Sequence, residues 1–166
     1  MSDKKELKTT KIEERQLVIF KLAGEEFGVD ISEVKEIIKM EDITTIPNIE
    51  DTIKGVINLR GKIIVVMSLA KKLNLQVKQS DKDTRIIIIE IGDNVVGMIV
   101  ESVEEVLRVT SDKISASPDM IRREINADYL EGVCVLNQRL VILLDLAKIL
   151  NAKDMSNIAK IQEQHG

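Results

Sequence analysis

The chain repeats itself, and this internal duplication constrains its fold more than any other feature. Residues 53–75 align with residues 130–152 at an offset of 77 and share 8 identities in 23 positions. Residues 17–39 align with residues 86–108 at an offset of 69, with 4 identities in 23 and the same hydrophobic pattern. The stretch between the matched segments is 13 residues long in the first copy and 21 in the second, an excess that accounts for 77 − 69 = 8. The chain therefore contains two copies of one unit, the second with an insertion.

Each copy predicts about five short strands. Isoleucine and valine supply 25 and 16 of the 166 residues, and such β-branched side chains favour strands. In the first copy, residues 17–22 and 27–31 predict one hairpin, and residues 56–59 and 62–67 predict a second around a two-residue turn. Between them, apolar residues three to four apart predict either one helical turn or a bulged strand. We expect an all-β fold, mainly strands with short helices, in two pseudo-symmetric five-stranded barrels.

Short helices should follow the second hairpin of each copy. Ser68 and Asp145 occupy equivalent positions, and both side chains can cap a helix N-terminus. Asn74 and Asn151 can each take the left-handed conformation that ends a helix. Apolar residues spaced three to four apart after Asp154 predict a further, C-terminal helix.

The domain organisation follows from the duplication. We expect a flexible segment over residues 1–15, one domain over residues 16–152 and a C-terminal helix or tail over residues 153–166. Within the domain, the first unit covers about residues 16–80 and the second about 81–152. The sequence leaves open whether the units exchange strands. No apolar run approaches the roughly 20 residues that cross a bilayer, so we expect no membrane insertion.

The composition argues against most catalytic and metal chemistry. The single histidine, His165, lies one residue from the C-terminus, where it is poorly placed to act in a nucleophile pair or a zinc site. The single cysteine, Cys134, lies between valines in a predicted strand and is interpreted as a buried apolar residue. With no Trp, 2 Phe, 1 Tyr and a net charge of −4, the chain lacks the stacking platforms and positive field of nucleic-acid binders. We expect no catalytic residue, cofactor, metal or nucleic acid.

A few surface positions remain as candidate contacts. Arg60, at a hairpin tip, is either a solubilising charge or a guanidinium offered to a partner's carboxylates. Glu36 and its counterpart Glu105 are ordinary surface charges from their position alone. Five apolar positions fit the core most simply, although a seam between two units would be built from such positions and could hold an amphipathic helix. These positions are Val34, Ile37, Val96, Val103 and Val106.

Several motifs resemble a known family. Phe27-Gly-Val-Asp-Ile31, then Asn58-Leu-Arg-Gly61, then Tyr129-Leu-Glu-Gly132 occur in the order and spacing typical of the CheW family of bacterial chemotaxis coupling proteins. The resemblance covers nearly the whole chain, about residues 16–152. It implies two five-stranded SH3-like β-barrel subdomains and an adaptor that is not an enzyme.

The resemblance also implies partners and contact residues. The family joins the regulatory domain of the histidine kinase CheA, a homologous domain, to the cytoplasmic tips of methyl-accepting chemoreceptors, so a cytoplasmic location at receptor arrays is expected. The implied receptor-facing residues are Val34, Glu36, Ile37, Val96, Gly97, Val103 and Val106. The residues that match the signature needed for assembly with receptor and kinase are Gly55, Asn58, Arg60 and Gly61.

Other functions stay open at this point. The chain could be an isolated interaction domain, of the type that regulates kinases, from another signalling system. A small hydrolase would need a working carboxylate pair, and no local motif marks one. A nucleic-acid-binding barrel would require an affinity that falls steeply with salt.

Overall fold

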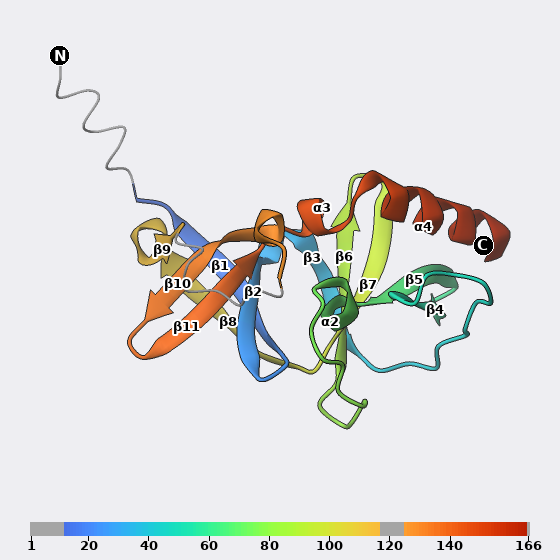
Figure 1. Cartoon of the computed structure of the whole chain (residues 1–166), viewed down its shortest axis with the longest axis horizontal. Coiled ribbons are helices and arrows are strands. Elements are labelled where there is room, and N and C mark those ends of the chain that lie inside the picture. The colour runs from blue at the N-terminus through green and yellow to red at the C-terminus, as the bar shows by residue number, and fades with distance from the viewer. Residues whose placement is uncertain (1–11, 117–124, 166) are drawn as a thin grey trace, which may run out of the picture.

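The computed structural model describes residues 12–116 and 125–165, and its strands form two sheets (Figure 1). We call the six-stranded sheet subdomain A and the five-stranded sheet subdomain B. In spatial order, subdomain A contains β8 (Ser102–Thr110), β1 (Glu14–Leu22), β2 (Glu25–Asp30), β11 (Arg139–Leu144), β10 (Leu130–Leu136) and β9 (Ile114–Ser115). Subdomain B contains β3 (Val34–Lys39), β6 (Arg85–Ile91), β7 (Asn94–Val100), β5 (Lys62–Ser68) and β4 (Ile53–Leu59). The predicted mainly-β fold with two β subdomains is confirmed, with a sixth strand in one of them.

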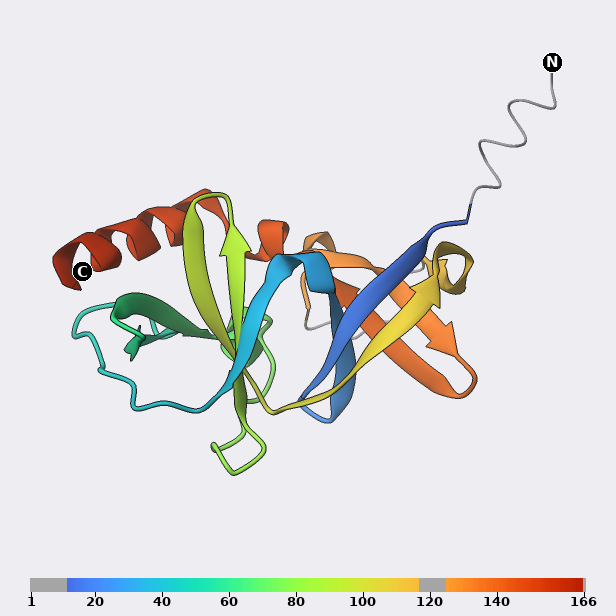
Figure 2. The same ribbon diagram turned by 180° about the vertical axis from the view of Figure 1, so that it is seen from behind.

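Each sheet combines strands from both sequence copies. The chain leaves subdomain A after β2, passes through the 3₁₀ turn η1 (Ile31–Glu33) and enters subdomain B as β3. It returns after β7 by way of β8, which pairs antiparallel with β1. Both β3 and β8 are the outermost strands of their sheets, and Figure 2 shows them on the same face of the molecule, one on each side of the junction. Both interpretations of the segment after β2 hold in part, since η1 is a helical turn and β3 is bulged after Val34.

The long apolar runs are explained by burial on both faces of the strands. In β1, Leu17 and Ile19 pack inside subdomain A, whereas Val18 and Phe20 pack into a core between the two subdomains. Strands that are buried on both faces have nearly continuous hydrophobic sequences instead of alternating ones. The apolar side chains of the described residues thus form three clusters, one inside each subdomain and a larger one shared between them.

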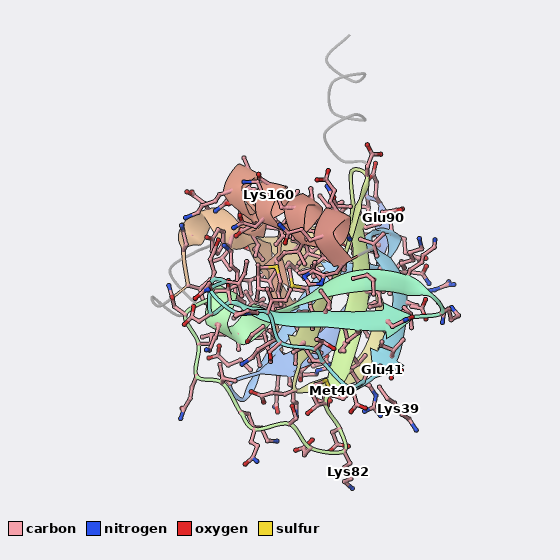
Figure 3. The ribbon with its side chains drawn as sticks, turned by 90° about the vertical axis from the view of Figure 1, so that its right-hand side faces the viewer. Lys39, Met40, Glu41, Lys82, Glu90 and Lys160 are labelled. Atoms are coloured by element: carbon pink, nitrogen blue, oxygen red, sulfur yellow. The ribbon has the colours of Figure 1, made fainter. Side chains whose placement is uncertain are left out.

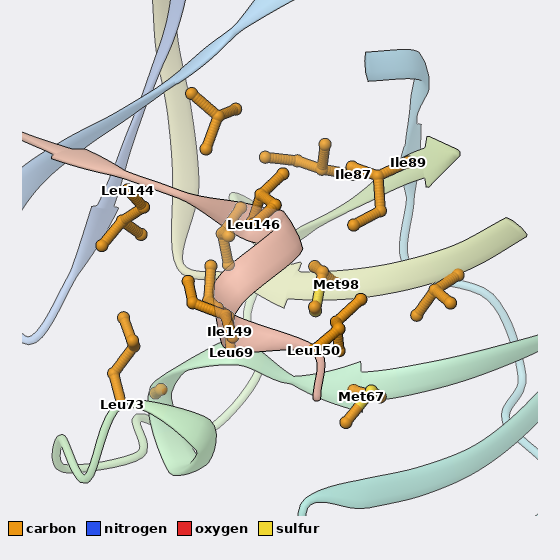
Figure 4. Packing of buried hydrophobic residues seen from close by; sticks show 14 of the residues in the cluster. Met67, Leu69, Leu73, Ile87, Ile89, Met98, Leu144, Leu146, Ile149 and Leu150 are labelled. Carbon is orange, nitrogen blue, oxygen red and sulfur yellow. The ribbon is translucent and has the colours of Figure 1, made fainter. Parts of the chain in front are cut away.

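Both subdomains contribute to the shared core (Figure 4). Ile87, Ile89 and Met98 come from subdomain B, and Leu144 comes from the last strand of subdomain A. The short helices α2 (Leu69–Lys72) and α3 (Leu146–Ile149) close this core with apolar side chains from each copy. Neither subdomain can therefore open alone without exposing apolar surface to water, at a cost of about 25 cal/mol per Å2.

The predicted helix caps are present, with one correction. Ser68 Oγ accepts a hydrogen bond from the Lys71 N–H at 3.2 Å, Asp145 caps α3 in the same way, and Asn74 is left-handed with φ +60° after α2. Asn151 does not end α3, as the sequence predicted, but starts α4 (Ala152–His165). Its side chain accepts from the Asp154 N–H at 2.9 Å, and the Asp154 carboxylate accepts from the Asn151 N–H at 3.1 Å, which is a capping box. The prediction was wrong because the second copy continues directly into another helix.

The insertion in the second copy adds local structure to subdomain A. It contains η2 (Ser111–Lys113), β9 and η4 (Ala127–Tyr129). Most of the predicted N-terminal segment lies outside the described residues, but β1 already begins at Glu14. None of the helices in the described ranges is long and apolar enough to span a membrane.

Candidate protein-interaction site

An apolar strip on β3 and β8 borders the shared core. Each of its four side chains is paired across the sheet with a residue of that core, so all four point toward the junction of the subdomains. The pairs are Val34 with Ile89, Ile37 with Ile87, Val103 with Phe20 and Val106 with Val18. We call Val34, Ile37, Val103 and Val106 the seam strip.

The seam strip is partly open to solvent. Val34 and Val103 are half-buried against the shared core, whereas Ile37 is 38% exposed and Val106 is 49% exposed. Val34 corresponds to Val103, and Ile37 to Val106, at the repeat offset of 69. The duplication therefore builds one apolar surface from two equivalent strands at the edges of the two sheets.

A polar hollow adjoins the seam strip at Val103. Its volume is about 420 Å3, and charged groups of both signs line it. Lys21 pairs with Glu104 at 3.6 Å, and the Arg85 guanidinium is held by the carbonyl oxygens of Lys82 and Thr84, each at 2.9 Å. This part of the surface presents an apolar strip beside an ionic hollow.

A second surface lies at the end of subdomain B, where its hairpin turns meet. A pocket of about 570 Å3 opens there, and we call it the barrel-end pocket. Its floor is apolar and contains Leu59, Ile63, Ile64, Ile88 and Val95. The other lining residues, which we call its rim, are polar or charged except for Gly61; they are Lys35, Glu36, Arg60, Gly61, Lys62, Asp93 and Gln162. Figure 3 views this end of the molecule, with β4 and β5 in front and α4 above them.

The signature residues build the turn at the pocket rim. The Asn58 side chain accepts a hydrogen bond from the Gly61 N–H at 2.8 Å. Arg60 and Gly61 have φ of +52° and +85°, as a tight hairpin turn requires. Arginine adopts this left-handed conformation rarely, and here the β4–β5 turn holds it at the hairpin tip.

Arg60 and Glu36 form an ion pair across the rim. The pair joins the β4–β5 turn to β3, and the bond to Glu36 raises the pKa of the Arg60 guanidinium. Glu36 lies on β3 opposite Ile88 of the pocket floor. The sequence singled out both residues, and the fold brings them together over 24 positions of chain. The resemblance grouped Glu36 with Val34 and Ile37, but the structure places Glu36 on the opposite face of β3, at the pocket rim and away from the seam strip.

Ion pairs span the equivalent end of subdomain A. Arg139 bridges Glu26 at 2.6 Å and Glu105 at 2.9 Å, and its pKa is raised, chiefly by the hydrogen bond to Glu26. In subdomain B, Lys62 of the first copy stands at the position of Arg139, and Val95 of the second copy stands at the position of Glu26. Subdomain B therefore lacks the Arg139–Glu26 bridge at the end where the barrel-end pocket lies.

Three of the predicted contact residues are structural. Val96 is fully buried in the shared core, and Gly97 is packed so tightly that a Cβ would lie 2.8 Å from Ile86 Cγ2. Gly55 has φ +146°, and a Cβ there would lie 2.1 Å from the Thr44 carbonyl oxygen. None of the three offers a side chain to a partner, because Val96 is buried and the two glycines are required by close packing around their backbone.

Sequence reasoning missed several residues of this surface. Lys62, Val95 and Gln162 all line the barrel-end pocket. Comparing the two copies position by position could have indicated the first two, since each replaces a member of the ion-pair bridge in the other copy. Gln162 could not have been found in this way, because α4 has no equivalent in the first copy.

Metal ligands and the single thiol are the next groups to consider. Within residues 12–116 and 125–165, no three His, Cys, Asp or Glu side chains are grouped to hold a metal ion. Cys134 is buried, and burial raises the pKa of its thiol, which makes it a poor nucleophile. The seam strip and the barrel-end pocket remain as the two surface features of interest.

Comparison with known proteins agrees with this description. Residues 16–154 match the CheW-like domain. The chain belongs to the CheW family. It is 35% identical over 151 residues to the chemotaxis protein CheW of Klebsiella aerogenes, covering 91% of this chain and 90% of that protein. It is 30% identical over 153 residues to the chemotaxis protein CheW of Treponema pallidum, covering 90% of this chain and 89% of that protein.

A solved structure shares the fold. The crystal structure of the scaffolding protein TtCheW from Thermoanaerobacter tengcongensis has 34% sequence identity and a TM-score of 0.77. The match covers 86% of this chain and 91% of that one. The resemblance seen in the sequence motifs is therefore confirmed, and the chain is a scaffold-type chemotaxis protein of this family.

Proposed function

We propose that this CheW-family chain is an adaptor, without catalytic activity, that couples the histidine kinase CheA to methyl-accepting chemoreceptors. The observation that carries the proposal is the presence of two separate binding surfaces, the seam strip and the barrel-end pocket. An adaptor must hold two partners at once, and its surfaces must not overlap. The adaptor would act in the cytoplasm, at the receptor tips.

The seam strip suits the receptor. The cytoplasmic tip of a chemoreceptor would present a helix, and an amphipathic helix binds by laying its apolar face on an apolar surface. Val106 and Ile37 supply exposed apolar surface from both subdomains, and the hollow beside Val103 can accept charged side chains. Binding would bury apolar side chains in the middle and leave charges at the edge, as in other protein interfaces.

The barrel-end pocket suits the kinase. The resemblance implies that the regulatory domain of the kinase has the same fold, so two barrels could meet end to end. The pocket has an apolar floor for an inserted side chain, and Arg60 and Glu36 lie on its rim. An interface of this kind would be modest in area and reversible.

Co-sedimentation with receptor cytoplasmic fragments and kinase tests the proposal, with kinase phosphorylation followed in the same samples. Val106→Glu places a charge on the seam strip, and we expect receptor affinity to fall by about tenfold or more. Val77→Glu is the matched control, because Val77 is 42% exposed and lies outside the seam strip. Arg60→Glu places two carboxylates side by side at the pocket rim, and we expect it to reduce kinase recruitment.

Two results would contradict the proposal. If the wild-type chain joins neither partner, or if Val106→Glu and Val77→Glu behave alike while both remain folded, the seam strip is not the receptor surface. If receptor-dependent phosphorylation proceeds equally well without the chain, it is not the coupler.

A further inference from the structure

Helix α4 lies outside the duplication and almost entirely outside the family match. The match ends at residue 154, near the start of the helix. In the first copy, α2 is followed by an extended connection into β6 and not by a second helix. The duplication therefore does not explain the role of α4.

The helix is anchored firmly over subdomain B. Ile158 and Ile161 are buried in the shared core. Asp154, only 2% exposed, accepts the Lys72 ammonium at 2.6 Å, and the Lys72 side chain is itself 11% exposed. Asn157 donates to Glu50 of the loop before β4. Separating the two charges of a buried ion pair would leave each of them buried without a partner, which strongly destabilises a protein. The first turns of α4 are therefore held in place.

The last turns of α4 reach the barrel-end pocket. The Gln162 amide donates to the Val95 carbonyl oxygen at 3.3 Å, and both residues line the pocket. Gln162 thus holds the end of α4 against β7 and forms one side of the opening. The helix covers part of a site whose other walls come from the barrel alone.

One cation on the pocket rim differs from its neighbours. Arg60 is paired with Glu36, and Lys35 with Glu90 at 3.8 Å. Among the described residues, Lys62 has no carboxylate within 4.0 Å. Its counterpart Arg139 bridges two carboxylates within the chain. Lys62 is exposed and has no such partner among the described residues, so its ammonium can pair with a carboxylate of another protein.

We propose that Gln162 is a specificity-determining wall of the barrel-end pocket. The pocket then selects a partner segment with an apolar side chain for its floor and, beside it, a carboxylate that pairs with Lys62. This inference rests on the proposed function, because the partner at this pocket is the regulatory domain of the kinase. It adds to that function the chemistry of the segment that enters and the helix that decides the fit.

The test uses the full-length chain with three substitutions. Gln162→Ala removes the wall, and Gln164→Ala is the matched control because Gln164 is exposed on the same helix two residues away. Lys62→Glu reverses the charge at the rim. Affinity for the kinase regulatory domain is measured by titration calorimetry at low and high salt, with affinity for a receptor fragment and thermal melting measured in parallel.

We expect Gln162→Ala to weaken kinase binding by about threefold to tenfold, because the entering segment loses its contacts with this wall of the pocket. Gln164→Ala should have no effect, and neither should change receptor affinity. We expect Lys62→Glu to weaken kinase binding at low salt and to reduce its dependence on salt, because attraction between exposed charges is screened. Melting temperatures should stay close to wild type.

The outcomes separate this inference from the function on which it rests. If the wild-type chain does not bind the kinase domain, both are overturned. If the wild type binds and Gln162→Ala equals Gln164→Ala, only the role of α4 is overturned. If Lys62→Glu leaves the affinity and its salt dependence unchanged, the predicted carboxylate is wrong. An equal loss of kinase and receptor binding would show a general structural effect and would also overturn the proposal.

Discussion

Two neighbouring isoleucines test whether the subdomains unfold as one unit. Ile87 is buried in the shared core and Ile88 in the core of subdomain B, and they are 2% and 1% exposed. Replacing either by alanine removes three carbon atoms from a packed site and leaves a cavity, at a cost of about 2 to 5 kcal/mol. For a chain of this size, each kcal/mol lowers the melting temperature by about 2 to 4 °C. With a loss of about 3 kcal/mol in the free energy of unfolding, we expect both variants to melt about 6 to 12 °C below wild type.

The single cysteine reports on the opposite subdomain. Cys134 lies in the core of subdomain A, so a thiol reagent reaches it only when that subdomain opens. If the shared core makes unfolding cooperative, Ile88→Ala in subdomain B raises the labelling rate of Cys134 as much as it raises the unfolded population. A change of about 3 kcal/mol corresponds to roughly a hundredfold faster labelling.

The assay is pulsed thiol labelling in low urea beside calorimetry of the same samples. Ile87→Ala serves as the comparison, because its site belongs to both subdomains. The reasoning is refuted if Ile88→Ala leaves Cys134 labelling at the wild-type rate, or if calorimetry resolves two transitions. Either result would mean that the subdomains open independently in spite of the shared core.

Three further predictions concern single positions. Gly55→Ala forces a Cβ to within 2.1 Å of a backbone carbonyl at φ +146°, and we expect a loss of more than about 1 kcal/mol in urea unfolding. Burial, and after it the nearby Asp145 carboxylate, raises the pKa of Glu33 in the folded protein. Ionisation of Glu33 therefore opposes folding, and stability falls as the pH rises from the unfolded-state pKa of this group to its folded-state pKa. Glu33→Gln should therefore melt above wild type at neutral pH and equal to it well below pH 4, a trend that equal differences at both pH values would contradict. Asp154→Ala strands the Lys72 ammonium and removes the acceptor of the Asn151 N–H in the α4 capping box, and should cost about 3 kcal/mol by denaturant titration. A loss below about 1 kcal/mol would show that the pair is not buried in solution.

The fold was predictable where local chemistry determines it. Runs such as residues 86–89 identify strands, and Ser68 and Asp145 mark helix starts, because capping depends on neighbours in sequence. The combination of strands from both copies in each sheet was left open, since pairing such as that of β1 with β8 joins residues about 90 apart and leaves no local signal. Asn151 was misassigned for a related reason, since its role depends on the helix that begins directly after it.

The candidate site was predictable in its parts and not in its arrangement. Glu36 and Arg60 were singled out from motif and position, but their ion pair depends on how β3 meets the β4–β5 turn. Val34 and Val96 have the same residue type, yet one lies at the outermost strand of a sheet and the other is fully buried in its middle. Hydrophobic pattern alone does not separate these cases, because both belong to strands with apolar faces.

The mixing of the two copies in each sheet bears on the origin of the chain. A half-length ancestor with a single copy would carry strands for two different sheets and could complete neither. Two such chains could exchange hairpins and rebuild both sheets, with the shared core as the interface of a symmetric dimer. In a single chain the two ends need not be identical. Lys62 and Arg139, at equivalent positions, differ accordingly: one lines the barrel-end pocket, and the other bridges two carboxylates.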